Sequence, residues 1–279
     1  MRIVSLMENV SGRAGCPSEH GLSLYIETGG HRILSDTGAT GLFAQNAASL
    51  KVDLSSVDIV FISHAHYDHT GGLRTFAGIN KNAVIYAQKS AIREYYHVTP
   101  SEEKYIGMEK EAAELPAMRY LTEDTAIDDS LHIFTNVTGR RRWPEGNKEL
   151  MEKRDGGFVQ DRFRHEQYLV IREGEKRVLV SGCAHNGILN ILDAFRERFG
   201  GEPDAVLSGF HMMRGAAEAP EDAYSEKDVE NVKATALELK QMKTAFYTCH
   251  CTGLIPFRIM KEIMGEQLTY VHNGDELHL

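Results

Sequence analysis

The sequence predicts an α/β fold in which two β-sheets pack face to face and helices cover their outer sides. Short apolar runs typical of strands recur along the chain, and helical patterns separate many of them. Glu173-Gly174-Glu175 joins two of these runs as a hairpin turn, so the sheets are expected to be at least partly antiparallel. The expected strands lie at residues 2–7, 22–28, 31–35, 58–63, 83–87, 130–135, 167–172, 176–181, 204–208, 244–248 and 268–271.

Two long helices are predicted from apolar residues that recur at helical spacing. Residues 187–199 carry one such stripe, and Asn186 is the expected N-cap. Residues 226–240 carry another, with Ser225 placed to cap the first turn. We interpret both stripes as faces of the core rather than as cofactor-binding surfaces.

Length and composition predict one globular domain that spans residues 1–279. A hydrophobic content of 42% and a charged content of 25% are ordinary for a soluble protein. The formal net charge of −9 disfavours a nucleic acid partner, because such binding depends on lysine and arginine side chains that neutralise phosphates. A small-molecule substrate is therefore expected, whereas the oligomeric state cannot be derived from these features.

The apolar runs are too short for membrane insertion or secretion. No run approaches the roughly 20 apolar residues of a membrane span, and the segment 1–6 is shorter than the core of a signal peptide. The chain has only four cysteines, and three of them lie close to histidines, so a disulfide framework is not expected. These features predict a protein of the reducing cytoplasm with no membrane partner.

Residues 96–165 depart from the alternation of strands and helices. A helix is expected within 101–114, whereas 140–161 is polar and contains glycine. Long ordered insertions in compact domains usually have a function, so we interpret this stretch as a loop-rich lid that selects the substrate. Arg140-Arg141-Arg142 concentrates positive charge there and is a candidate contact for a substrate phosphate, with a solvated basic patch as the alternative.

The most informative motif is His64-Ala-His-Tyr-Asp-His69, which directly follows an apolar strand. His64 and His66 are two residues apart, so both can point the same way from an extended segment, whereas Asp68 and His69 turn towards a second position. Neutral imidazole and carboxylate are ligands that zinc, iron and manganese accept. One short loop can therefore serve two metal ions.

These residues match the HxHxDH motif of the metallo-β-lactamase superfamily, and the chain resembles that family over nearly its whole length. Asp36-Thr37-Gly38 is similar to the first motif of the family. More narrowly, the sequence resembles a branch labelled 7,8-dihydropterin-6-methyl-4-(β-D-ribofuranosyl)aminobenzene 5′-phosphate synthase, through Glu19-His20-Gly21-Leu22-Ser23, Gly182-Cys183-Ala184-His185, Gly209-Phe210-His211 and His250-Cys251-Thr252-Gly253. The resemblance implies a four-layer αββα sandwich that binds two divalent transition-metal ions, with zinc favoured over manganese or iron.

The resemblance also implies the remaining metal ligands. His250 matches the last histidine of the superfamily, which belongs with Asp68 and His69, and His185 is the ligand expected in this branch. Cys183 stands where a bridging aspartate is often found, and it could be a thiolate ligand or a packed cysteine. For His211 the roles of ligand, substrate contact and proton shuttle remain open.

The other polar residues near these motifs are expected to play lesser parts. Asp36 is expected to hydrogen-bond a ligand or the adjacent backbone, and Glu19 and His20 are candidates for the mouth of the site. No ligand role is expected for His165. The remaining histidines are interpreted as structural or exposed: His31, His97, His132, His272 and His278.

The sequence thus predicts a dinuclear metal-dependent hydrolase or transferase that acts on a small, phosphorylated or pterin-like substrate. Asp68 and His211 are the candidate catalytic residues, Asp68 as a ligand that orients a bridging hydroxide and His211 as a proton donor or oxyanion contact. A thioester or lactone hydrolase is the alternative, and a nuclease or phosphodiesterase is disfavoured by the acidic charge. A flavo-diiron oxidoreductase and a metal-binding protein without activity are weaker alternatives.

Overall fold

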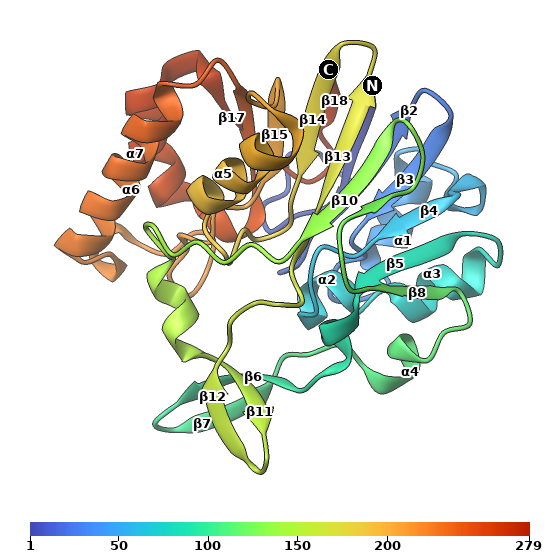
Figure 1. The fold of residues 1–279 in the computed structure, drawn as a ribbon, viewed down its shortest axis with the longest axis horizontal. Coiled ribbons are helices and arrows are strands. Elements are labelled where there is room, and N and C mark those ends of the chain that lie inside the picture. The colour runs from blue at the N-terminus through green and yellow to red at the C-terminus, as the bar shows by residue number, and fades with distance from the viewer.

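A computed structural model describes all residues from 1 to 279. Two seven-stranded sheets pack face to face at the centre of the molecule, and helices cover the outer side of each (Figure 1). This is the four-layer αββα sandwich that the sequence predicts. None of the helices combines the length and the apolar composition that crossing a membrane requires.

The first sheet is formed mainly by the N-terminal half of the chain, with the last strand at one edge. Strands β3 and β4 run parallel, whereas β1, β2 and β3 are antiparallel neighbours. In order across the sheet, its strands are β18 (Glu276–His278), β1 (Arg2–Met7), β2 (Ser23–Thr28), β3 (His31–Ser35), β4 (Ile59–Phe61), β5 (Val84–Gln88) and β8 (Met118–Leu121).

The second sheet is formed mainly by the C-terminal half. Its strands β14 to β17 are parallel to one another, and β13 and β14 form the expected hairpin, with Glu173 paired to Lys176. In order across the sheet, its strands are β17 (Leu268–Tyr270), β16 (Ala245–Thr248), β15 (Ala205–Ser208), β14 (Lys176–Val180), β13 (Gln167–Glu173), β10 (Leu131–Thr135) and β9 (Thr125–Ala126).

Seven α-helices complete the layers. Three of them, α5, α6 and α7, cover the second sheet, whereas α1 and α3 cover the first (Figure 1). The α-helices are α1 (Leu42–Ser49), α2 (Tyr67–Thr70), α3 (Leu73–Ile79), α4 (Lys110–Ala113), α5 (Ile188–Phe199), α6 (Glu226–Lys240) and α7 (Leu254–Met264). Short 3-10 helices occur at η1 (Leu54–Ser56), η2 (Lys89–Ile92), η3 (Glu145–Glu149), η4 (Glu221–Ala223), η5 (His250–Thr252) and η6 (Gly265–Gln267).

The core consists of three apolar layers, which follow from the alternation of side chains along each strand. On β3, Ile33 points between the two sheets and Leu34 points towards the helices outside the first sheet. Ile33 packs in the same cluster as Leu169 of the second sheet. The stripes on α5 and α6 lie in the third layer, against the outer face of the second sheet, as expected for core helices.

The helix starts agree only in part with the sequence. Ser225 caps α6 as predicted, and it forms a reciprocal capping box with Asp228. At α5, however, Gly187 is the N-cap, so the prediction for Asn186 is wrong. The Asn186 side chain instead donates hydrogen bonds to the Glu166 carboxylate and the Tyr168 hydroxyl, both buried.

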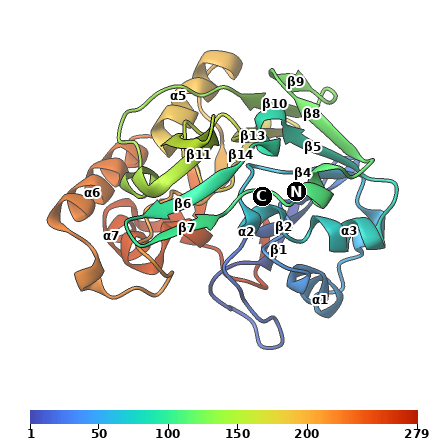
Figure 2. The same ribbon diagram turned by 90° about the horizontal axis from the view of Figure 1, so that it is seen from below.

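The stretch 96–165 contains more strand structure than the predicted loop-rich lid. Its first and last parts build a third, four-stranded antiparallel sheet, and its middle part returns to the two main sheets as β8, β9 and β10. In order, the third sheet consists of β12 (Gly157–Gln160), β11 (Leu150–Arg154), β6 (Tyr95–Thr99) and β7 (Glu102–Tyr105). Figure 2 shows β6, β7 and β11 on the side of the molecule that faces the viewer.

The helix expected within 101–114 is largely wrong. Residues 102–105 form β7, and only the four residues of α4 are helical. Pairing with β6 places Tyr105 opposite Tyr96, with ring centroids 5.3 Å apart. This cross-strand contact within the β6–β7 hairpin outweighs the helix propensity of Glu102 and its neighbours, which is a weak preference in any sequence.

Candidate metal centre

The candidate site lies where several strands of the two main sheets end. Asp36 follows β3, and His64 lies three residues beyond β4. In the second sheet, Cys183 follows β14, His211 follows β15 and His250 follows β16. Because β14, β15 and β16 are parallel, their carboxyl ends meet at one edge, and the loops that leave this edge bring their side chains together.

Three histidines form a first group of metal donors. The Nε2 atom of His64 lies 3.1 Å from Nδ1 of His66 and 3.3 Å from Nε2 of His185. A tetrahedral zinc ion with Zn–N bonds of about 2.0–2.1 Å holds its nitrogen ligands roughly 3.3 Å apart. The spacing of these nitrogens therefore fits one such ion, and the structure brings together the three residues expected to bind the first metal.

Asp68, His69 and His250 form a second group beside the first. His250 Nε2 lies 3.1 Å from Oδ2 of Asp68 and 3.2 Å from Nε2 of His69, and the His69 nitrogen lies 3.5 Å from the same carboxylate oxygen. Two imidazoles and one carboxylate make a donor set that zinc, manganese and iron accept. The three residues expected at the second metal are therefore also brought together.

Four of the histidines are oriented by a hydrogen bond at Nδ1. Because the Ser63 hydroxyl donates to Asp36, it accepts from His64, and the other three partners are oxygen acceptors. Donation from Nδ1–H leaves the lone pair of Nε2 directed into the site, which is the tautomer that a metal ion needs. The pairs are His64 with Ser63 at 3.0 Å, His69 with Asp36 at 2.7 Å, His185 with Asn147 at 3.0 Å and His250 with Asn9 at 2.7 Å.

Comparison with known protein families identifies the family of the chain. The profile of the metallo-beta-lactamase superfamily matches residues 18–246. The chain belongs to this superfamily. The match covers most of the chain, including the motif from His64 to His69 and the strands that carry Cys183 and His211.

Two proteins of Methanocaldococcus jannaschii are similar to this superfamily member over nearly their whole length. One is the 7,8-dihydropterin-6-methyl-4-(beta-D-ribofuranosyl)-aminobenzene-5'-phosphate synthase, which is 29% identical over 98% of this chain and 95% of its own. The other, the uncharacterized protein MJ0448, is 27% identical over 92% of each chain.

Among solved structures, Tm1679, described as a metal-dependent hydrolase of the beta-lactamase superfamily, is similar with a TM-score of 0.81. It is 29% identical, and the alignment covers 100% of this chain and 99% of that one. Zn(2+)-bound PqqB from Methylobacterium extorquens shares the fold, with a TM-score of 0.56 and 13% identity over the full length of both chains.

Burial sets the charge state of the donor groups in this superfamily member. It lowers the pKa of His66 and of His250 to about 3, and it lowers the pKa of His64 and His185 well below the usual value. These rings are therefore neutral near pH 7, which is the form that binds metal. Burial opposes ionisation of Asp68, but His69 and hydrogen bonds from two other histidines hold its pKa well below the usual range.

Asp36 supports both the loop and a donor ring, as expected. Its carboxylate accepts from the Ser63 backbone N–H at 2.8 Å and the Ser63 hydroxyl at 2.7 Å, in addition to the His69 ring. Burial lowers the pKa of His69, but Asp36 and Asp68 outweigh it, and the net shift is upward. Asp36 therefore fixes the His69 tautomer from outside the donor group.

Cys183 lies between the two donor groups. Its Sγ atom is 3.2 Å from Nε2 of His69, and it is close to donor atoms of both groups. Burial raises the pKa of this thiol well above its usual value in the structure described here. The position is suitable for a bridging ligand and also for a packed thiol, so both roles predicted from the sequence stay open.

His211 stands beside the first donor group, and its ring nitrogen lies close to the sulfur atoms of Cys183 and Cys251, so a role as a ligand stays open. Its ring lies 4.1 Å from that of His185 by centroids, and burial lowers its pKa to about 4. His20 lies at the mouth, with Nε2 3.3 Å from the Asp68 carboxylate. Glu19, in contrast, points to the loop at Thr40, where it accepts backbone and hydroxyl hydrogen bonds.

A pocket of about 430 Å³ opens onto the donor groups, and the third sheet forms part of its wall. Lys104 and Ile106 come from the β7 region, whereas Glu149 ends η3. His97, interpreted from the sequence as having no role in the site, also lines this pocket and lies 3.0 Å from the Glu149 carboxylate. Residues from 96–165 therefore line the pocket over the donor groups, at the place where the lid was expected.

The interpretation of Arg140-Arg141-Arg142 as a phosphate contact is wrong. None of the three lines the pocket over the donor groups. Arg141 pairs with Asp193 at 2.9 Å and also with Glu238, and Arg142 pairs with Glu238 at 2.9 Å. These carboxylates on α5 and α6 neutralise Arg141 and Arg142, whereas Arg140 donates hydrogen bonds to the Asn186 side chain and to backbone carbonyls.

His165 lies behind the first donor group, where its ring is within ligating distance of His66 and Asp161. It accepts from the Ala65 backbone N–H at 3.1 Å, and its other nitrogen lies 2.9 Å from the Asp161 carboxylate. Both ring nitrogens therefore already have partners. His66, whose Nδ1 faces the first group, has no hydrogen-bond partner at Nε2.

Several supporting residues could not be found from the sequence. Asn9 and Asn147 hold donor rings from segments far away in the chain, and no spacing rule connects them to His250 or His185. Glu166 is fully buried and accepts from the backbone N–H groups of His185 and Asn186. The sequence offers one signal for Glu166, which is its position directly before the apolar strand β13. A charged residue at the edge of a core is rarely buried without partners.

Proposed function

We propose that the chain is a dinuclear metal-dependent hydrolase or transferase that acts on a small phosphorylated or pterin-like molecule. One observation carries the proposal: the donor atoms of two adjacent groups of three residues lie 3.1–3.3 Å apart, which is the spacing of ligands around one metal ion. The Nε2 atoms of His64 and His185 face each other, as do those of His69 and His250, and because these rings donate from Nδ1 no proton lies between the facing nitrogens. A metal ion explains this approach.

The donor chemistry fits two divalent transition-metal ions, zinc foremost, with manganese and iron as alternatives. His64, His66 and His185 would hold one ion, and Asp68, His69 and His250 would hold the other. When bound, such a pair activates water near neutral pH and stabilises the negative charge of the transition state. Asp36 and the other Nδ1 partners keep the rings oriented, so little reorganisation accompanies binding.

The chain's own residues complete the reaction site. Asp68 orients the attacking water, and His211, next to His185, donates a hydrogen bond to the oxygen that gains charge or to the leaving group. The third sheet contributes His97, Lys104 and Leu150 to the wall of the pocket. His20, close to the Asp68 carboxylate, holds that side chain in place at the mouth of the pocket.

Lys104 takes the place of the arginine triplet as the contact for a substrate phosphate. It lines the pocket, and its ammonium group lies 5.2 Å from the centre of the Tyr67 ring rather than against a carboxylate. A cation that is not neutralised can pair with an anionic group. The M. jannaschii relative, whose name includes both a dihydropterin and a 5'-phosphate, supports a substrate with these parts.

The Tm1679 structure supports hydrolysis as the more general chemistry, because that protein is described as a metal-dependent hydrolase. All four cysteines are free thiols, which supports a reducing compartment such as the cytoplasm for this enzyme. An acidic chain with one lysine at the pocket also supports a small substrate over a nucleic acid.

The test is turnover by the metal-loaded protein of matched substrates, phosphate esters on one side and a thioester and a lactone on the other. We expect metal-dependent turnover of the phosphate esters, and its loss in His66→Ala and Asp68→Ala together with metal. His132→Ala, at a histidine outside the site, is the matched control and should leave both unchanged. Turnover of only the thioester or lactone would replace the proposed substrate class, and equal activity in all variants would refute the site.

A further inference from the structure

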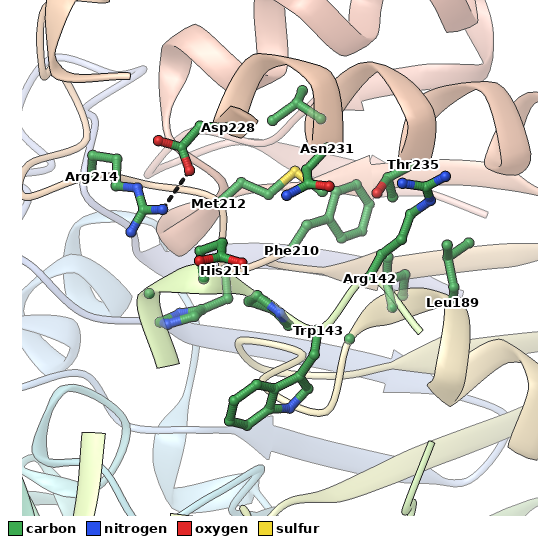
Figure 3. A pocket seen from close by; sticks show the side chains of 16 residues that line it. Arg142, Trp143, Leu189, Phe210, His211, Met212, Arg214, Asp228, Asn231 and Thr235 are labelled. Carbon is green, nitrogen blue, oxygen red and sulfur yellow. Dashed lines mark hydrogen bonds and ion pairs between the residues drawn. The ribbon is translucent and has the colours of Figure 1, made fainter. Parts of the chain in front are cut away.

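A second, smaller cavity lies directly beside the metal pocket. It has a free volume of about 40 Å³ and shares Gly146, His211 and Arg214 with the larger pocket. Figure 3 shows it between α6, the start of α5 and the segment that carries Arg142 and Trp143. The two cavities therefore adjoin at His211, beside the metal donors.

The side cavity combines an apolar lining with polar groups that have no partner. Phe210 and Leu189 belong to its apolar side, and α6 contributes Asn231 and Thr235, four residues apart and so on one face of the helix. Thr235 is only 3% exposed, and neither polar side chain is hydrogen-bonded to another residue that lines the cavity (Figure 3). His211 has a buried Nδ1 that also lacks a partner.

The buried Thr235 side chain and the buried Nδ1 of His211 point to a ligand, because buried polar atoms in proteins are nearly always hydrogen-bonded. Asn231 is half-buried beside them. A hydroxyl and a carboxamide offer both donors and acceptors, and an apolar lining with a few convergent polar groups is typical of sites for small molecules. The indole of Trp143 points away from Asn231 in Figure 3, so it leaves this edge of the cavity open.

The charges of the lining favour a neutral ligand over an anion. Arg142 is paired with Glu238 at 2.9 Å, and Arg214 is paired with Asp228. Glu145 is likewise neutralised, by Lys148 at 2.5 Å and Lys227 at 2.9 Å. Each charged group of the wall thus already has its counterion, so the cavity offers no excess positive charge to a phosphate.

We propose that the side cavity binds the lactam edge of a nitrogen heterocycle, whose adjacent N–H and C=O groups pair with Asn231 and Thr235. A volume of about 40 Å³ accepts an amide-sized edge but not a whole ring, since a cavity of about 150 Å³ is needed for benzene. The rest of the ring therefore extends past His211 into the metal pocket. This assignment rests on the proposed function for the reaction at the metals, whereas binding of the heterocycle is a separate property.

The experiment compares two flat bicyclic compounds, 6-methylpterin, which has a lactam edge, and quinoxaline, which has none. Equilibrium dialysis with the metal-loaded protein gives their Kd values. We expect 6-methylpterin to bind about tenfold more tightly than quinoxaline, and Asn231→Leu and Thr235→Val each to weaken it about fivefold through the loss of a neutral hydrogen bond. Thr235→Ser keeps the hydroxyl and should bind as the wild type, and quinoxaline should be indifferent to all three changes.

Glu230→Gln, on the same helix but outside the side cavity, is the control for effects on α6, and metal content with circular dichroism verifies folding. The same Kd for both compounds in the wild type would overturn the proposal, as would variants that lose affinity for inorganic phosphate instead of 6-methylpterin. Failure of the proposed function has a different signature, because then no phosphate ester is turned over although 6-methylpterin still binds through Asn231 and Thr235.

Discussion

Each donor histidine with a partner at Nδ1 is oriented mainly by one oxygen atom. At His250 this oxygen belongs to Asn9, 2.7 Å away, and Asn9 comes from the segment just after β1. Partners of this kind fix the tautomer and the direction of the ring, and their loss typically weakens metal binding 10- to 100-fold. Substitution of a supporting residue should therefore change metal affinity measurably, as substitution of a ligand does.

Asn9→Ala should therefore weaken metal binding at the second donor group by about 10- to 100-fold without unfolding the protein. Competition with a chelating dye measures this affinity. Asn82→Ala, at an exposed position outside the site, is the matched control and should have no effect. An unchanged affinity in Asn9→Ala would show that His250 needs no support from Asn9.

Cys183→Ser tests the role of the thiol between the two donor groups. We expect the variant to keep its full metal content, because His64, His66 and His185 on one side and Asp68, His69 and His250 on the other offer three donors each without the sulfur. Elemental analysis of the purified variant gives the number of ions per chain. Loss of one ion would instead make Cys183 a ligand, and the description of the second group would have to include it.

At the residue scale, local spacing in the sequence predicted what lies within one loop. The motif from His64 to His69 specifies four donors that a single loop delivers, and the resemblance to a known family added His185 and His250. Asn9 and Asn147 could not be predicted, because their contacts join segments more than thirty residues apart. Only the fold determines which distant amide meets which ring.

At the scale of secondary structure, the site depends on parallel strands that end together. The strands β14, β15 and β16 each deliver one loop to the same edge, and the motif loop after β4 meets them from the first sheet. These strands are largely buried and read as mostly apolar runs, so the sequence predicted them. The hairpin between β13 and β14 was equally clear, because its turn is local.

The third sheet was missed for the opposite reason. Its strands β7 and β12 are short and largely exposed, so they carry no apolar alternation. Pairing between β6 and β11 joins residues about fifty positions apart. Such pairing can be recognised in the structure, whereas a single sequence offers only the polar composition, which suggested a loop.

The third sheet also supplies the prediction for substrate selection. Lys104→Met should raise KM for a phosphorylated substrate about five- to tenfold, because an ammonium contact to an exposed phosphate is lost, and it should leave a neutral ester unchanged. Lys110→Met, on α4 and outside the pocket, is the matched control. Steady-state kinetics gives KM for both substrates. An equal change of KM for both would show that Lys104 does not contact the phosphate.

At the scale of the whole molecule, three apolar layers hold the sandwich together, and none of the donor residues belongs to them. We therefore expect the protein to stay folded after a chelator removes the metal. A ligand that binds only the native state adds about 2.7 kcal/mol at a hundredfold excess over its Kd, so Tm should fall by several degrees. Loss of the circular dichroism signal at room temperature would show that ligation holds the fold.

The central claim is that two donor groups bind two ions side by side, and anomalous scattering from crystals of the as-purified protein tests it most directly. The account predicts two peaks, one enclosed by His64, His66 and His185 and the other by Asp68, His69 and His250. A single peak would contradict the dinuclear site, and a peak enclosed by His66, Asp161 and His165 would place the metal on the wrong side of the His66 ring.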